Sequence, residues 1–344
     1  MDTNIGAKER VTQERLIGLF QNVLKYDYLG NWEYREDNAN VEEALLRRYL
    51  KRRSYADKEI DKAVAKLKQA AANIGIGLYN ANHEVYTLLR YGVNVQSEVS
   101  EHKKMVHLID WANPMENDLQ IAEEVTVQGK SDRRPDLVVY VNGIAVAVIE
   151  LKRSKVHEGI RQNIRNQEDE YIPRFFTTVQ LLFAGNDTEG LHYGVIKTPE
   201  KFWLRWKEPC GEPCEPSLFT PDRYPNELDR SVLQFFEPHR LLEYIHDFII
   251  FDGGRKKTAR PNQYFAIKKR VPCCISMSSH ESRTALLCLQ KRNQPRPSHS
   301  NHPKPAEHNR KRQCRQDHRR PQPIAPPNHS AEHRSRQWRR GNPK

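Results

Sequence analysis

Three residues near the middle of the chain have the types and the spacing that metal-assisted hydrolysis needs. Asp136 is followed after thirteen residues by Glu150, and Lys152 comes two positions later. Two carboxylates can hold a divalent cation such as Mg²⁺, and a neighbouring lysine can orient or activate a water molecule. The Glu-x-Lys tripeptide alone is weak evidence, because a solvated ion pair is its ordinary explanation.

The residues between Asp136 and Glu150 predict a buried β-hairpin. Two apolar, β-branched runs, 137–141 and 144–149, flank Asn142-Gly143, which is a strong hairpin signal. Both runs are apolar at consecutive positions, so both faces of the strands should be buried. Carboxylates at the open end of such a hairpin are costly to desolvate unless a cation compensates them.

The hairpin register decides whether the two carboxylates share one face of the sheet. A strict two-residue turn at 142–143 would send Asp136 and Glu150 to opposite faces, because side chains alternate along a strand. A three-residue loop at 141–143 with a bulge would put Asp136, Glu150 and Lys152 on one face. We predict this second geometry, or a bulge elsewhere in the hairpin with the same effect.

The segment after the hairpin predicts a helix with two further polar candidates. One helical stripe, with spacings of four, four, three and four, comprises Val156, Ile160, Ile164, Gln167 and Tyr171. Gln167 should therefore face the sheet, where a buried amide needs hydrogen-bond partners. Either Gln167 is a satisfied core amide, or Gln167 and Tyr171 reach the catalytic end of the hairpin.

Pro135-Asp136 together with Glu150-Leu151-Lys152 resembles the PD-(D/E)xK nuclease motif. With Gln167-x-x-x-Tyr171 behind it, the region is similar to the nuclease region of the restriction (R) subunit of type I restriction-modification enzymes. The similarity covers about residues 10–270 and includes the stretches 110–114, 122–127, 175–180, 184–190 and 197–201.

The resemblance implies an α/β fold with a restriction-endonuclease-like PD-(D/E)xK core, which is a mixed sheet flanked by helices. It implies that Asp136, Glu150 and Leu151 hold Mg²⁺ and that Lys152 is the catalytic lysine. Gln167 and Tyr171 would be accessory catalytic residues. Nuclease folds of this kind often carry another acidic residue on an early helix, and Glu43 is a candidate for it.

We expect four segments along the chain. Residues 1–90 form an N-terminal helical segment, and residues 91–208 form the nuclease core. Residues 209–270 form a linker and the start of a helicase motor, and residues 271–344 form a disordered basic tail. Within the third segment, 226–236 and 238–250 have the patterns of two helices that end at Asp252-Gly253-Gly254.

In type I R subunits, a stretch similar to 259–266 opens a superfamily 2 helicase motor in which a glutamine reads adenine. Gln263 matches that position, although an ordinary helix start explains the same residues. ATP is expected for the full-length family. The phosphate-binding motif G-x-x-x-x-G-K-[ST] is absent from this sequence.

The tail differs sharply from the rest of the chain. Residues 271–344 carry a net charge of +12, whereas residues 1–270 carry 40 charged side chains of each sign. The tail holds 10 of the 21 prolines and shows no apolar periodicity, so it cannot offset its chain entropy by burial. It is either a basic tail that binds nucleic acid nonspecifically or the product of a frameshift near residue 270, which we favour.

Several classes of protein are disfavoured. No stretch approaches 18 apolar residues and the N-terminus is not a signal peptide, so we expect a soluble cytoplasmic protein that does not contact a membrane. Six cysteines in such a chain do not suggest a disulfide framework. Cys210 and Cys214 are expected to be reduced thiols rather than zinc ligands.

The leading interpretation is the endonuclease domain of a type I R subunit that lacks its ATP-dependent translocase. It would hydrolyse DNA phosphodiesters with Mg²⁺. Double-stranded DNA and the specificity and methylation subunits of the complex would be its partners. One alternative is a stand-alone PD-(D/E)xK DNA repair nuclease. The other is an inactive fragment that only binds DNA or the methyltransferase.

Overall fold

The computed structural model describes residues 3–96, 103–208 and 219–275. A seven-stranded mixed sheet with the order β1-β4-β5-β6-β7-β8-β9 forms its centre. The strands are β1 (Asp27–Asn31), β4 (Leu119–Glu123), β5 (Leu137–Val141), β6 (Ile144–Leu151), β7 (Leu181–Asn186), β8 (Gly190–Gly194) and β9 (Leu204–Arg205). With helices on both faces, this arrangement confirms the predicted mixed α/β class.

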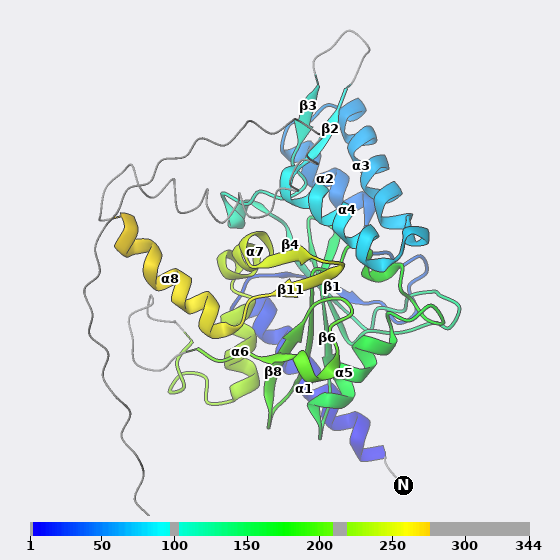
Figure 1. The fold of residues 1–344 in the computed structure, drawn as a ribbon. Helices are drawn as coiled ribbons and strands as arrows, with labels where there is room; N and C mark the ends of the chain where they lie inside the picture. Colours follow the sequence, from blue (N-terminus) through cyan, green and yellow to red (C-terminus); the bar gives the residue numbers. More distant parts are fainter. Residues whose placement is uncertain (1–2, 97–102, 209–218, 276–344) are drawn as a thin grey trace, which may run out of the picture. The chain divides into compact units, whose positions relative to one another are not determined.

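Three helices pack on one face of this sheet: α1 (Thr3–Asn22), α6 (Glu227–Phe235) and α7 (Pro238–Asp247). The opposite face is covered by α5 (Val156–Arg165) and the short helix η3 (Phe175–Thr177). Figure 1 shows α5 beside the central strands. Because α5 connects β6 to the parallel strand β7, it supplies the crossover that parallel pairing requires.

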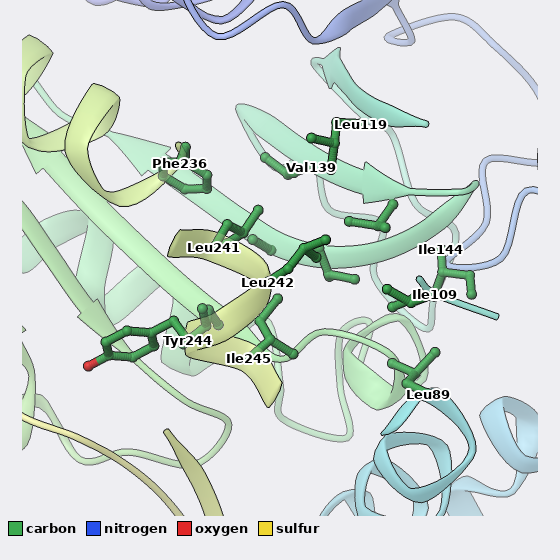
Figure 2. Close-up of a cluster of buried hydrophobic side chains, with 14 of the residues drawn as sticks. Leu89, Ile109, Leu119, Val139, Ile144, Phe236, Leu241, Leu242, Tyr244 and Ile245 are labelled. Carbon is green, nitrogen blue, oxygen red and sulfur yellow. The ribbon is translucent and has the colours of Figure 1, made fainter. Parts of the chain in front are cut away.

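The centre of the sheet is the hairpin of β5 and β6, and every residue of both strands is buried. Their side chains alternate between two apolar clusters. Val139 and Ile149 face α1, α6 and α7, whereas Val138 and Val148 face α5. Figure 2 shows the first cluster, in which Leu241, Leu242 and Ile245 of α7 lie over Val139, Leu119 and Ile144, and the labels also mark Leu89, Ile109, Phe236 and Tyr244. The predicted burial of both faces is confirmed.

A second group of elements packs at the turn end of the hairpin. It comprises α2 (Glu43–Arg52), α3 (Asp57–Ala72), α4 (Leu78–Tyr91) and the two-stranded sheet of β2 (Val93–Val95) and β3 (Lys104–Val106). Three further short helices are η1 (Ile74–Ile76), η2 (Pro114–Glu116) and η4 (Glu200–Phe202). The segment predicted as helical, 1–90, also contributes strand β1, which pairs in parallel with β4.

The segment 249–258 corrects one prediction. The helix expected over 238–250 ends at Asp247, and β10 (Ile249–Asp252) pairs with β11 (Arg255–Thr258) in a second hairpin. Gly253 and Gly254, with φ of 55° and 75°, form its turn, because glycine adopts the left-handed backbone conformation at low cost. Helix α8 (Pro261–Ile275) follows.

Some predictions concern residues outside the described ranges. Cys210 and Cys214 belong to this group, as does most of the tail predicted to be disordered over 271–344, from residue 276 onward. Residues 271–275 are described and continue helix α8, so the prediction of disorder is wrong for them. Among the described residues, no helix has the length and apolar character that crossing a membrane requires.

Candidate active site at the open end of the central hairpin

The register of the β5–β6 hairpin brings Asp136 and Glu150 to the same face. The turn itself is the strict two-residue type, with Val141 paired to Ile144, so the three-residue loop predicted from the sequence is wrong. The register shifts once inside the hairpin, between the pairs Val139–Ala147 and Tyr140–Ala145.

The shift leaves Val146 as an extra residue on β6. This is a β-bulge, which reverses the facing of every side chain beyond it. Leu137 pairs with Ile149 beyond the bulge, so Asp136 lies opposite Glu150. The alternative that we predicted, a bulge elsewhere in the hairpin that puts Asp136 and Glu150 on one face, is therefore confirmed.

Asp136 and Lys152 both contact the backbone of Leu151, the last residue of β6. The Lys152 ammonium lies 3.7 Å from Oδ2 of Asp136 and donates to the carbonyl of Leu151 at 2.9 Å. The backbone N–H of Leu151 donates to the same Asp136 oxygen at 2.6 Å. Both side chains are mostly buried, with 16 % and 18 % exposure. The cluster is therefore fixed by backbone as well as by charge.

Glu150 is the buried carboxylate of the cluster. Its exposed fraction is 0 %, and its Oε1 accepts a long hydrogen bond of 3.4 Å from the amide of Asn166. Within the described part of the chain, Oε2 is buried without a hydrogen-bond partner. Burial and, secondly, the Asp136 carboxylate raise the pKa of Glu150 well above its ordinary value, and Lys152 acts in the opposite direction.

This donor set fits a small divalent cation. An unpartnered buried carboxylate oxygen is costly, and a cation shared with Asp136 would remove that cost. The Leu151 carbonyl is a third oxygen of the type that Mg²⁺ accepts. Among the described residues, no group of three or more His, Cys, Asp or Glu side chains has the arrangement of a metal site. The candidate site therefore rests on two carboxylates and a carbonyl.

Two adjoining hollows open on either side of this cluster. We call the first, of about 440 Å³, the acidic hollow; Asp136 and Leu151 line it with Arg10, Gln13, Asn31, Glu33, Glu123, Glu124, Arg134 and Gln162. We call the second, of about 510 Å³, the basic hollow; Lys152 lines it with Arg133, Glu158, Arg161, Gln162, Arg165 and Asn166. Carboxylates thus gather on one side of the Asp136–Lys152 pair and cations on the other.

Gln167 and Tyr171 lie apart from direct contact with the carboxylates. Helix α5 ends at Arg165, so the predicted helical stripe to 171 is too long. The Gln167 amide donates to the carbonyl of Asn163 at 2.8 Å and accepts from the N–H of Lys197 at 2.7 Å. It is a satisfied core amide. Tyr171 stacks under the guanidinium of Arg133, 3.8 Å from its ring centre. The catalytic role of both residues stays a prediction.

Glu43 was the predicted acidic residue on an early helix, but it lies at the turn end of the hairpin, whereas the candidate site lies at the open end. Glu43 pairs with Arg47 and Lys68, and the preceding residue, Glu42, donates its N–H to the carbonyl of Gly143 in the hairpin turn. The early helix that reaches the site is α1, which contributes Gln13.

Two residues near the site were not predicted from the sequence, namely Gln13 and Glu124, a carboxylate that Gln13 orients. The amide of Gln13 donates to Glu123 and to Glu124, both at 3.0 Å. Glu124 has a φ of 50°, which few residues other than glycine adopt. Its N–H donates to the carbonyl of Asp136 at 2.9 Å. The signal for Glu124 in the sequence was the pair of adjacent acids Glu123-Glu124, at the end of the strand that pairs with β5.

Gln263 lies on the exposed start of α8. Its side-chain oxygen accepts from the N–H of Arg260 at 2.8 Å, which caps the helix. This contact agrees with the ordinary explanation of a helix start, and adenine recognition stays a prediction.

The open end of the central hairpin thus carries an Asp–Glu–Lys cluster that is buried or mostly buried, on a mixed α/β fold. Residues 6–201 match the family described as type I restriction enzyme R protein N terminus. The chain belongs to this family.

Its relatives carry names of the same kind. It is 25 % identical over 260 residues to the Methanocaldococcus jannaschii protein provisionally named type I restriction enzyme MjaIXP endonuclease subunit, covering 70 % of this chain and 25 % of that protein. It is 26 % identical over 234 residues to the type I restriction enzyme HindI endonuclease subunit of Haemophilus influenzae, covering 64 % and 22 %. The chain spans about a quarter of the length of these relatives.

Proposed function

We propose that this chain is the nuclease segment of a type I restriction R subunit and that the Asp136–Glu150–Lys152 cluster hydrolyses phosphodiester bonds of double-stranded DNA. The observation that supports this proposal is the buried Glu150 oxygen without a partner, beside Asp136 and Lys152 at the open end of a rigid hairpin. Family membership supports DNA as the substrate class, and the residue types of the cluster support hydrolysis as the chemistry.

In this proposal, Asp136, Glu150 and the Leu151 carbonyl would hold Mg²⁺. The bound cation would polarise the scissile phosphate and lower the pKa of a water molecule. Lys152 now donates to the Leu151 carbonyl. Turning its ammonium toward a substrate phosphate would free that carbonyl and place a positive charge where negative charge develops during hydrolysis.

The remaining family properties are also proposals. The specificity and methylation subunits would select the DNA site, and the cytoplasm would be the place of action. Gln263 would contact adenine only where a complete motor follows it. Because the phosphate-binding motif is absent from the sequence, we expect no ATP hydrolysis by this chain.

The test is the nicking of supercoiled plasmid in Mg²⁺ by the full chain. Asp136→Ala and Lys152→Ala should each lower the nicking rate at least about 100-fold, the range expected when a group that acts in proton transfer or charge stabilisation is removed. Asp169→Ala and Lys155→Ala remove exposed charges nearby and should nick at the unaltered rate. Equal rates for all of these proteins would refute the assignment of the cluster.

A further inference from the structure

The basic hollow beside Lys152 has an uneven charge balance. Four cationic side chains line it, namely those of Arg133, Lys152, Arg161 and Arg165, against one carboxylate, that of Glu158. Two of the cations already have partners, because Lys152 lies 3.7 Å from Asp136 and Arg161 lies 2.8 Å from Glu200. The charges of the other two arginines are available for a ligand.

Arg133 and Arg165 approach the hollow from different elements. Arg133 lies in the loop before β5, where it pairs through its backbone with Val127, and Arg165 is the last residue of α5. Over the described ranges, neither guanidinium forms an ion pair with a carboxylate. Two guanidinium groups without a carboxylate partner on the lining of one hollow favour an anionic ligand there.

Tyr171 fixes the position of one of these groups. The Arg133 guanidinium carbon lies over the Tyr171 ring at 3.8 Å from its centre, and one of the guanidinium N–H groups donates to the carbonyl of Asp132 at 2.9 Å. A stack of this kind contributes attraction and also limits the rotamers of the arginine. The second residue of the Gln-x-x-x-Tyr pair thus acts on the hollow through Arg133 and does not contact the carboxylate cluster.

We infer that the basic hollow binds the backbone phosphate next to the scissile phosphate of a DNA strand, with Arg133 and Arg165 as its anion ligands and Tyr171 as a positioning residue for Arg133. This inference rests on the proposed function, since it places one strand across the Asp136–Lys152 pair. Guanidinium groups suit this ligand because their planar fork matches the geometry of phosphate oxygens. Phosphate contacts position a nucleic acid and carry no sequence information.

Equilibrium binding tests the two arginines separately from catalysis. Fluorescence anisotropy with a labelled 30-base-pair duplex in EDTA measures affinity of the full chain where no cleavage can occur. Arg133→Gln and Arg165→Gln should each weaken binding about five- to tenfold and lower the slope of log K against log salt by about one. The basic tail is the same in every variant, so the differences report the hollow.

The matched control is Arg48→Gln. The Arg48 side chain is 58 % exposed on α2, the helix at the turn end of the hairpin. The substitution removes the same charge as Arg133→Gln and Arg165→Gln. Affinity and salt slope should equal those of the unaltered chain. Equal binding by Arg133→Gln, Arg165→Gln and Arg48→Gln would overturn the inference and leave the hollow to some other anion.

Tyr171 needs a test that a merely structural role would not pass. Tyr171→Phe keeps the ring and should bind DNA normally, whereas Tyr171→Ala should match Arg133→Gln. Combining Tyr171→Ala with Arg133→Gln should give no further loss, because residues that act through one another are not additive. A further loss in the double variant, or a defect in Tyr171→Phe, would exclude the positioning role.

Failure of this inference and failure of the proposed function give different results. If the nuclease assignment is correct and the hollow is not used, Arg133→Gln nicks plasmid at the unaltered rate while Asp136→Ala is inactive. If the hollow is used and the cluster is not catalytic, the arginine variants lose DNA affinity while Asp136→Ala nicks normally.

Discussion

Replacing Glu150 by glutamine should stabilise the protein in the absence of divalent cations and abolish Mg²⁺-dependent cleavage. Glu150 is fully buried, its Oε2 has no hydrogen-bond partner within the described residues, and Asp136 is a neighbouring carboxylate. The folded chain must therefore either keep Glu150 protonated or bury its charge. Both choices cost free energy that a neutral amide of the same shape does not incur.

The magnitude follows from the ordinary pKa of 4.5 for this group. Holding the carboxyl protonated at pH 7.5 costs at most about 4 kcal/mol, at about 1.4 kcal/mol per pH unit. The glutamine amide also needs partners in the same site, which offsets part of the gain. We expect a net stabilisation of about 1–3 kcal/mol, or an increase in Tm of about 2–9 °C for a domain of this size.

The sign of the pH dependence is set by the direction of the shift. Because the pKa of Glu150 is raised in the folded state, its contribution to stability is greatest below about pH 4.5. That contribution is lost as the pH rises from the unfolded pKa toward the folded one. The advantage of Glu150→Gln should therefore grow from pH 5 to pH 8.

The assay is thermal unfolding followed by circular dichroism at both pH values, in EDTA and in Mg²⁺. Mg²⁺ at ten times its Kd should stabilise the unaltered chain by about 1.4 kcal/mol and should not stabilise the variant. Glu168→Gln, at an exposed position, is the control and should change neither quantity. A Glu150→Gln protein that is no more stable at pH 8 in EDTA would refute the argument.

Three further substitutions test buried positions, one beside the site and two elsewhere in the chain. Gly159→Val should destabilise the chain by about 1–3 kcal/mol in urea unfolding and slow nicking, because a Cβ there would lie 3.2 Å from the Ala184 Cβ and 3.3 Å from the Glu150 Cβ. Burial lowers the pKa of Lys256 well below its ordinary value, so the folded state holds fewer protons than the unfolded state, and stability should rise with pH up to about 10.5. Lys256→Met should flatten that rise in urea unfolding between pH 7 and 9, and a slope unchanged from the unaltered chain would contradict this. Asn142→Ala should lower the free energy of unfolding by about 2–4 kcal/mol, because the buried Asn142 side chain donates to the carbonyl of Leu108 and accepts from the N–H of Asp118. A smaller loss would mean that other contacts hold the turn.

The hairpin shows how much of the fold the sequence could predict. Asn142-Gly143 and the apolar runs beside it predicted the two buried strands, because those signals are local. The position of the bulge could not be predicted in the same way. A Cβ on Gly143 would lie 2.6 Å from the Leu45 Cβ, and the Gly143 carbonyl accepts from Glu42. Packing of α2 therefore accompanies the tight turn, and the extra residue is taken up further along β6.

The candidate site was predictable where neighbours in sequence are neighbours in space. Glu150 and Leu151 end strand β6, Lys152 follows directly, and strand pairing adds Asp136. Gln13 comes from a helix more than a hundred residues away, and no local pattern connects it to the site. The hairpin at Gly253-Gly254 was missed for a different reason, since two adjacent glycines are themselves a hairpin signal that the predicted helix over 238–250 left unused.

The core that α6 to α8 share with the central sheet limits where the polypeptide can be shortened. Phe235, Leu242 and Phe265 belong to the same apolar cluster as Val139 of β5 and Phe183 of β7. A polypeptide that stopped at residue 208 would expose that face of the sheet to water and invite aggregation. The smallest unit able to fold by itself therefore extends to about residue 265, well into the segment whose sequence resembles the start of a motor.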